Sequence, residues 1–311
     1  MKKSIIIFAI IVLIGAGGYF FIKNSSKTPS SVDNTVTPPI TTTGTSTEKP
    51  KTETATTTKK VEQVPGEAVI GKTVEGRDIK AYTYGTGATK LLFVGGIHGG
   101  YEWNTVLLAY QLSDYFKANP KAVPSNVQVT VIPVLNPDGL NLTVGSAERF
   151  VATDVPSGKD ATVAGRFNAN TVDLNRNFDC TWQASGVWQK KAVSGGSKAF
   201  SEPESQAMKA YIEANKPSAV VVWYSAAGGV FASNCEKGIL PDTTKIMNTY
   251  ASASGYPKYD SFDFYETSGD MVNWLAKSNI PAISVILTNH TDVEWSKNFK
   301  GVEALLKSYA K

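Results

Sequence analysis

Residues 166–178 read Arg-Phe-Asn-Ala-Asn-Thr-Val-Asp-Leu-Asn-Arg-Asn-Phe, the most distinctive stretch of this 311-residue chain. Two arginines, one aspartate and four asparagines occur within it. Any one of these residues alone would fit a surface ion pair or a polar loop. The block as a whole is poorly explained in that way, and the segments around it indicate what kind of fold carries it.

Four apolar segments outside this block are expected to be buried strands, because nearly continuous apolar runs suit strands that helices cover on both faces. They are 90–95, 127–134, 218–223 and 281–286. Helical patterns are found at 103–118, 203–215, 241–253, 269–278 and 293–310. This alternation predicts a single α/β domain with a mixed central β-sheet covered by helices on both faces. In such sheets, functional residues gather at the carboxyl ends of the strands.

Local signals predict two helix starts and one turn. Ser201 with Glu204 predicts a capping box for the helix at 203–215, and Thr291 with Glu294 predicts another for the last helix. Residues 136–139, Asn-Pro-Asp-Gly, predict a turn because each of these residue types favours turn conformations.

The first 65 residues differ in composition from the rest. Residues 4–22 form an uncharged apolar run, close to the roughly 20 residues that a membrane-spanning helix needs. Lys2 and Lys3 precede it, which predicts that the following chain is exported. Residues 1–23 are therefore an uncleaved membrane anchor, the favoured interpretation, or a cleaved signal segment. The domain is expected outside the cell membrane as a single-pass protein, with a secreted protein as the alternative.

Residues 24–65 are rich in Ser, Thr, Pro and Lys and predict a disordered stalk, because they offer little apolar surface to bury. Residues 1–65 contain eight Lys and four Asp or Glu, a net charge of +4. The whole chain is also +4, so residues 66–311 are close to neutral. The basic balance therefore belongs to the first segment and gives no argument for a nucleic-acid partner.

Cys180 and Cys235 are the only cysteines. In an exported domain an even pair most often forms a disulfide. Cys180 follows the 166–178 block closely, so a bridge that fixes loops beside it is the favoured interpretation. Two unpaired buried thiols are the alternative.

His98 and Glu102 lie in a glycine-rich segment after the strand at 90–95. An imidazole and a carboxylate near a helix start are good zinc ligands. The glycines leave the backbone open to an approaching substrate. A histidine at a strand end is also commonly a structural, hydrogen-bonded residue.

Together these motifs resemble the zinc metallocarboxypeptidase family, which removes the last residue of a peptide. Five motifs, found in the family's order, cover nearly all of residues 66–311 and imply a zinc carboxypeptidase-like fold. The resemblance implies that His98 and Glu102 bind zinc and that Arg166 stabilises the oxyanion formed at the scissile carbonyl. It also implies that Asp173 accepts a hydrogen bond from His98 and fixes its tautomer.

The substrate-binding residues come from the same resemblance. Asn175 and Arg176 would hold the terminal carboxylate of the substrate, and a guanidinium suits this role because it pairs with carboxylates through two parallel hydrogen bonds. Tyr265, in the sequence Tyr-Glu-Thr-Ser-Gly at 265–269, would close over the bound peptide.

Two positions depart from the family pattern. Tyr224 stands where the family has its third zinc ligand, a histidine, and Ile286 stands where it has the general base. A tyrosine ligates metal only after losing a proton whose pKa is near 10, so zinc binding is expected to be weak or absent. An alkyl side chain cannot move protons, and general acid–base catalysis contributes about 10²–10⁴ in rate. The spacing between His98 and Glu102 is also one residue longer than in the family.

His290, Asp292 and Glu294 follow the last strand and are the available substitutes for the general base. His290, the only other histidine, is expected to be a solvated loop side chain. Glu294 already has a role in the expected capping box. Neither residue stands at the position of the family's base.

Three hypotheses for function remain open. The favoured one is a cell-surface protein, catalytically impaired, that binds the C-terminal carboxylate of peptides or wall peptides. The second is an active metallocarboxypeptidase with Tyr224 as a zinc ligand. The third is a structural surface protein that uses the fold as a scaffold.

Overall fold

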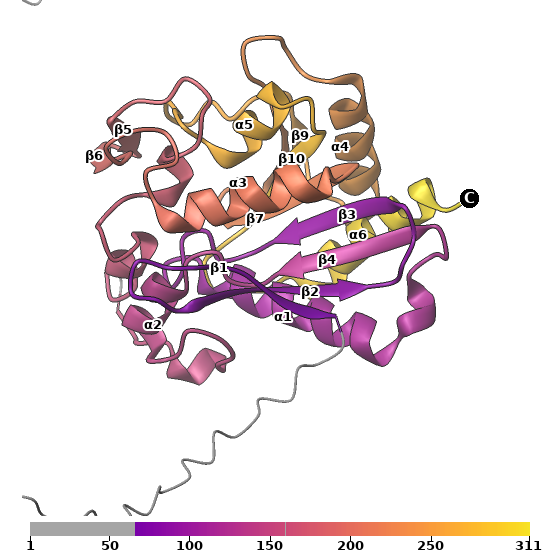
Figure 1. Cartoon of the computed structure of the whole chain (residues 1–311), viewed down its shortest axis with the longest axis horizontal. Helices are drawn as coiled ribbons and strands as arrows, with labels where there is room; N and C mark the ends of the chain where they lie inside the picture. The colour runs from indigo at the N-terminus through magenta and orange to yellow at the C-terminus, as the bar shows by residue number, and fades with distance from the viewer. Residues whose placement is uncertain (1–65, 159) are drawn as a thin grey trace, which may run out of the picture. The chain divides into compact units, whose positions relative to one another are not determined.

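The computed structural model describes residues 66–158 and 160–311 (Figure 1). The anchor or signal segment expected at 1–23 and the stalk expected at 24–65 lie outside the described residues. Within the described ranges, no helix combines the length and the apolar character that a membrane crossing requires.

An eight-stranded mixed β-sheet forms the centre of the domain, with strand order β1-β2-β4-β3-β7-β10-β8-β9. The bounds are β1 Glu67–Lys72, β2 Asp78–Tyr84, β3 Thr89–Val94, β4 Val127–Ile132, β7 Ala219–Ser225, β8 Gly229–Ala232, β9 Lys258–Tyr259 and β10 Ala282–Leu287. The four middle strands, β4, β3, β7 and β10, are mutually parallel. β2 and β8 join them antiparallel on either side. The predicted mixed sheet is confirmed.

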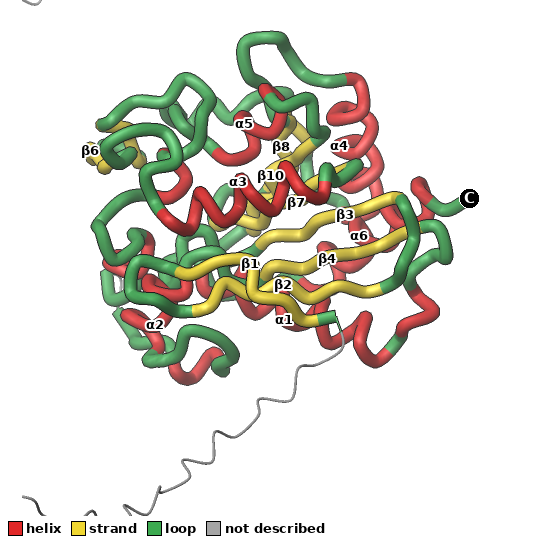
Figure 2. The backbone as a smooth tube through the Cα atoms, viewed as in Figure 1, coloured by secondary structure: helices red, strands yellow, loops and turns green. Residues whose placement is uncertain are grey.

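Helices cover both faces of this sheet, as Figure 2 shows. They are α1 Trp103–Ala118, α3 Pro203–Asn215, α4 Pro241–Ser254, α5 Met271–Lys277 and α6 Trp295–Tyr309. A further helix, α2 Pro137–Val144, packs instead against the 3-10 turn at Val163–Arg166. Side chains alternate between the faces of a strand. Thus Leu91 and Phe93 of β3 pack into the core under α1, α4 and α6, while Leu92 and Val94 pack into the core under α3 and α5.

Smaller elements surround this layered core. A separate hairpin pairs β5, Ser185–Trp188, with β6, Lys191–Ser194. Short 3-10 turns span Pro120–Ala122, Ala152–Asp154, Val163–Arg166 and Leu174–Arg176. The last of these, Leu174–Arg176, lies inside the 166–178 block and turns the backbone there.

The two expected capping boxes are wrong. α3 begins after Glu202 and α6 begins after Glu294, and neither residue makes a side-chain cap. Each supposed box carboxylate is instead bound by tertiary partners. Glu204 accepts from the Asn168 amide. Glu294 accepts from the backbone N–H and the hydroxyl of Thr288.

The turn expected at residues 136–139 is wrong as well, because these residues start helix α2. The Asn136 side chain accepts a hydrogen bond from the backbone N–H of Gly139 at 2.9 Å, and Pro137 occupies the first turn. Asparagine favours the N-cap position and proline the first helical position, so the same residues that favour a turn also favour a helix start.

Candidate functional site

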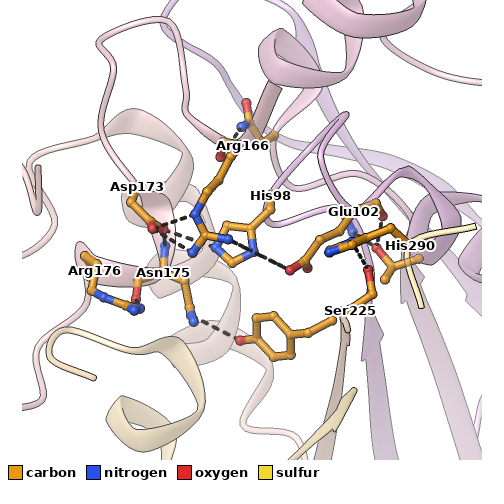
Figure 3. Close-up of polar contacts among 12 residues, drawn as sticks. His98, Glu102, Arg166, Asp173, Asn175, Arg176, Ser225 and His290 are labelled. Atoms are coloured by element: carbon orange, nitrogen blue, oxygen red, sulfur yellow. Dashed lines mark hydrogen bonds and ion pairs between the residues drawn. The ribbon is translucent and has the colours of Figure 1, made fainter. Parts of the chain in front are cut away.

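A cavity of about 470 Å³ opens where β3, β7 and β10 end. Its lining comes from the segment after β3, from the 166–178 block with the β5–β6 hairpin, from the ends of β7 and β10, and from loop 262–270. This is the sheet edge at which the sequence predicts function. Figure 3 shows the polar residues that meet there.

Close backbone contact joins the β3 end to the 166–178 block. Gly99 has φ +40°, and a Cβ there would lie 2.8 Å from the carbonyl oxygens of both Asn136 and Gly165. The next residue, Gly100, donates its N–H to the Gly165 carbonyl at 3.1 Å. Only glycine fits such an approach, and the contact places His98 beside the block.

Both nitrogens of the buried His98 ring face carboxylates. Nε2 lies 3.1 Å from Asp173 Oδ1, and Nδ1 lies 2.9 Å from Glu102 Oε1. Glu102 sits immediately before α1, so the helix start aims it back at His98. The structure thus brings together the three residues that the resemblance assigns to zinc and its hydrogen-bonded support.

Arg166 completes this cluster. Its Nε and Nη2 donate to Asp173 Oδ2 at 3.0 and 2.8 Å, and its Nη1 lies 3.3 Å from His98 Nδ1. Burial alone would raise the pKa of Asp173, but the Arg166 guanidinium and His98 hold that pKa well below its usual range. The Trp188 ring lies 4.5 Å from the Arg166 guanidinium carbon. Arg166 therefore has one fixed orientation.

Arg176 is buried and held by backbone carbonyls. Its Nε and Nη2 donate to the Val187 carbonyl at 3.2 and 2.7 Å, and Nη1 donates to the Asn175 carbonyl at 2.7 Å. A guanidinium has five N–H groups. These three bonds use one on each nitrogen and leave one N–H on each terminal nitrogen. The Tyr265 ring lies 5.8 Å from the guanidinium carbon and lines the same cavity.

The Tyr224 side chain points at Asn175. Its hydroxyl donates to Asn175 Oδ1 at 3.1 Å, and the backbone N–H of Met271 donates to the same oxygen at 3.1 Å. Burial raises the pKa of Tyr224 well above 10, and the Asp270 and Glu102 carboxylates raise it further. Tyr224 is therefore a neutral hydrogen-bond donor here.

Ile286 lies beside Tyr224 in parallel register on β10. Its side chain is buried in the apolar cluster under α3 and α5, and it also lines the cavity. The position that the resemblance assigns to a general base is thus occupied by hydrocarbon.

His290 is not the solvated loop side chain that was expected. Its Nδ1 lies 2.9 Å from Ser225 Oγ, its ring packs 4.6 Å from that of Tyr101, and it lines the cavity. Ser225 in turn contacts Asn104 at 3.0 Å. Sequence reasoning missed both partners of His290, Ser225 and Tyr101, and the Asn104 side chain behind Ser225. The signal was weak, although Ser225 directly follows Tyr224 in a segment already linked to the site.

The side chains present do not fit the zinc centre of a metallocarboxypeptidase. Catalytic zinc takes three protein ligands, and among the described residues no three His, Cys, Asp or Glu side chains converge to hold a metal. His98 and Glu102 would supply two ligands. The Tyr224 hydroxyl is already bonded to Asn175 and stays protonated.

The comparison with known protein families agrees with the fold. The family model described as zinc carboxypeptidase matches residues 67–292. The chain therefore belongs to the zinc carboxypeptidase family, a family of metallocarboxypeptidase-like hydrolases that normally uses zinc.

Solved structures share the fold. Murein-tripeptide amidase MpaA from Escherichia coli O157 has a TM-score of 0.57 and 23% sequence identity, covering 80% of this chain and 94% of that chain. Carboxypeptidase A from Helicoverpa armigera has a TM-score of 0.58 and 20% identity, covering 78% of this chain and 67% of that chain.

Curated relatives match over parts of their length. Carboxypeptidase Z of Rattus norvegicus is 30% identical over 135 residues, which are 39% of this chain and 19% of that protein. Gamma-D-glutamyl-L-diamino acid endopeptidase 1 of Lysinibacillus sphaericus is 23% identical over 218 residues, which are 63% of this chain and 54% of that protein. The chain thus spans about a fifth of the first relative and about half of the second.

Proposed function

We propose that this protein binds the free C-terminal carboxylate of peptides and that it hydrolyses peptides poorly or not at all. The observation that carries the proposal is Arg176. Three hydrogen bonds to backbone carbonyls fix its guanidinium beside the cavity, and one N–H remains on each terminal nitrogen. Two such N–H groups match the two oxygens of a carboxylate.

The opposite side of the cavity supports the second half of the proposal. Ile286 cannot accept a proton, and loss of a general base costs about 10²–10⁴ in rate. Tyr224 keeps its proton and donates a hydrogen bond to Asn175 Oδ1. A carboxylate can still bind where the groups that activate water are missing.

Wall peptides are the proposed ligand class. The names of two similar proteins support this choice: a murein-tripeptide amidase and a gamma-D-glutamyl-L-diamino acid endopeptidase. We also propose that the domain is displayed outside the cell membrane by residues 1–23 as an anchor, with secretion as the alternative. The apolar run at 4–22 after two lysines supports that placement.

Calorimetry with the full-length protein tests the binding proposal. A short peptide acid should bind more tightly than its C-terminal amide by about tenfold or more, because charge-assisted hydrogen bonds contribute about 1.5–3 kcal/mol. Equal affinities for acid and amide would contradict the recognition role of Arg176. Rapid hydrolysis of a blocked dipeptide, with or without added zinc, would instead favour an active peptidase.

A further inference from the structure

The hydrogen bonds of one buried amide fix the orientation of its neighbours. Asn104 is fully buried, and its Nδ2 donates to the backbone carbonyls of Asn289 and Asp292 at 2.8 and 3.0 Å. Carbonyl oxygens only accept hydrogen bonds, so the amide nitrogen must face them. The Asn104 oxygen therefore faces Ser225.

This orientation sets the hydrogen on Ser225 and then the one on His290. The Asn104 oxygen only accepts, so the single hydroxyl hydrogen of Ser225 is donated to it at 3.0 Å. Ser225 Oγ must then accept from His290 Nδ1, which lies 2.9 Å away. A neutral imidazole carries one ring hydrogen. In the neutral form of the ring, Nε2 of His290 therefore keeps a lone pair.

The charges around His290 agree with a neutral ring. Burial lowers its pKa, Glu102 opposes this effect, and His98 and Arg166 add to it. The ring also packs against Tyr101. His290 therefore offers the cavity an acceptor rather than a donor.

Glu102 provides a second acceptor in the same cavity. Its Oε1 is 2.9 Å from His98 Nδ1, but its Oε2 is buried without a hydrogen-bond partner among the described residues. Buried carboxylate oxygens are costly unless a donor or a cation meets them. Figure 3 shows the Glu102 carboxylate between His98 and His290 in this view.

We propose that Glu102 and His290 bind a primary ammonium group of the ligand, so that the protein recognises short zwitterionic peptides. The inference rests on the proposed function, in which Arg176 binds the carboxylate at another part of the same cavity. An ammonium group carries three N–H donors and a positive charge. Both acceptors belong to residues that line this cavity, and an ammonium group can donate a hydrogen bond to each of them.

The three N–H donors and the positive charge of an ammonium group complement a carboxylate oxygen and an imidazole lone pair. The ammonium could be the N-terminal group of a dipeptide or the side-chain amine of a diamino acid. Both present the same chemistry, and suitable ligands distinguish them.

Three ligands test the proposal on the full-length protein by calorimetry. They are L-Ala-L-Ala, N-acetyl-L-Ala-L-Ala and N-acetyl-L-Ala-L-Lys. The free dipeptide should bind about tenfold or more tightly than its acetylated form, as expected for a charge-assisted hydrogen bond. If N-acetyl-L-Ala-L-Lys binds more tightly than N-acetyl-L-Ala-L-Ala by the same factor, and L-Ala-L-Ala does not, the side-chain amine is the source of the ammonium.

Variants connect the preference to the site. Glu102→Gln keeps the size of the side chain but removes its charge, and should reduce the preference for a free amine to within about twofold. His290→Gln should reduce it as well. Glu213→Gln, at an exposed carboxylate, is the matched control and should leave it unchanged. Thermal unfolding of each variant checks that the fold is retained.

The outcomes distinguish failure of the ammonium site from failure of the proposed carboxylate binding. If L-Ala-L-Ala and N-acetyl-L-Ala-L-Lys bind no more tightly than N-acetyl-L-Ala-L-Ala, while peptide acids still bind more tightly than amides, only the ammonium site is overturned. Equal binding of acid and amide overturns the proposed function. Stoichiometric zinc binding that Glu102→Gln abolishes, without any preference for free amines, would show that a metal ion occupies this position.

Discussion

The cavity has two walls, one with buried charged side chains and one with neutral side chains. The loop wall, residues 166–188, keeps buried charged groups, each with partners: Arg166 with Asp173, and Arg176 with backbone carbonyls. The strand wall, formed by the ends of β7 and β10, presents a neutral phenol at Tyr224 and hydrocarbon at Ile286.

Under the proposed function, ligand binding depends on the loop wall and hydrolysis depends on the strand wall. A buried ion pair on the loop wall cannot lose one partner without leaving an uncompensated charge. On the strand wall, Ile286 joins the apolar core and Tyr224 bonds to Asn175. These two side chains contribute packing and a hydrogen bond to the fold, and neither can act as a general base.

The largest expected effect comes from rebuilding the strand wall. The double variant Tyr224→His, Ile286→Glu should raise zinc-dependent turnover of a blocked dipeptide by at least about 10²-fold, since a ligand and a base act on the same water. Tyr224→His alone should improve zinc affinity with slow hydrolysis, and Ile286→Glu alone should destabilise the fold by burying an unpaired carboxylate. Turnover of all four proteins with added zinc is the measurement.

Two results would change this comparison. Strong activity in the unmodified chain would mean that the strand wall is not impaired. An inactive double variant with bound zinc would point to the longer spacing between His98 and Glu102 as a further defect.

The next effect concerns the loop wall. Asp173→Ala leaves Arg166 buried without its carboxylate, and should lower the free energy of unfolding by about 3–5 kcal/mol. Urea denaturation measures it. The control is Asp114→Ala, which removes an exposed ion pair with Arg149 and should cost less than about 1 kcal/mol. Similar costs for the two variants would remove the distinction drawn between the walls.

The disulfide between Cys180 and Cys235 ties the end of the loop wall to the segment between β8 and α4. Replacing both cysteines by alanine should cost about 2–5 kcal/mol of stability. Denaturation of the variant beside the oxidised protein tests this. Free thiols detected by mass spectrometry in protein exported to an oxidising compartment would contradict the bridge.

A smaller effect is expected for ligand affinity. Arg176→Ala should weaken binding of peptide acids by about tenfold to a hundredfold and should barely change binding of the amides. The exposed Arg149→Ala is the control. If both variants bind peptide acids like the unmodified protein, the loop wall does not recognise carboxylates.

The smallest expected effect is a pH dependence. The pKa of Asp173 is lowered in the folded state, so its contribution to stability is present above its unfolded pKa, about 3.9, and is lost as pH falls. Between pH 5 and pH 3 this loss should be about 1 kcal/mol. Asp173→Asn should lack this part of the acid destabilisation, and Asp114→Asn should retain it. Equal acid profiles would contradict the charge pairing.

Much of the core was predictable from the sequence, because strands covered on both faces leave continuous apolar runs. The four predicted strands and five predicted helices agree with the structure at every end to within two residues. The outer strands β1, β2, β8 and β9 and the β5–β6 hairpin were missed; β1 and β9 contain no buried residue and so leave no apolar run in the sequence. Local residue types also misled at residues 136–139, where turn and helix-start preferences coincide.

The polar side of the site was harder to predict for a physical reason. His290 is placed by Ser225 and Asn104, which are distant in the sequence and reach it only through the packing of three elements. No local pattern around a single histidine reveals such partners. The unpartnered oxygen of Glu102 is likewise a property of the assembled cavity.

The disulfide also has a consequence for proteolysis of the domain. The Cys180–Cys235 bond closes a covalent ring around residues 181–234, which include α3, β7 and β8. A protease cut between residues 181 and 223 would place Arg176 and Tyr224 on different peptides that stay joined through sulfur. Such a nicked molecule would run as one species on a non-reducing gel and separate into two fragments only after reduction. A gel run only without reductant would therefore miss cleavage in this segment.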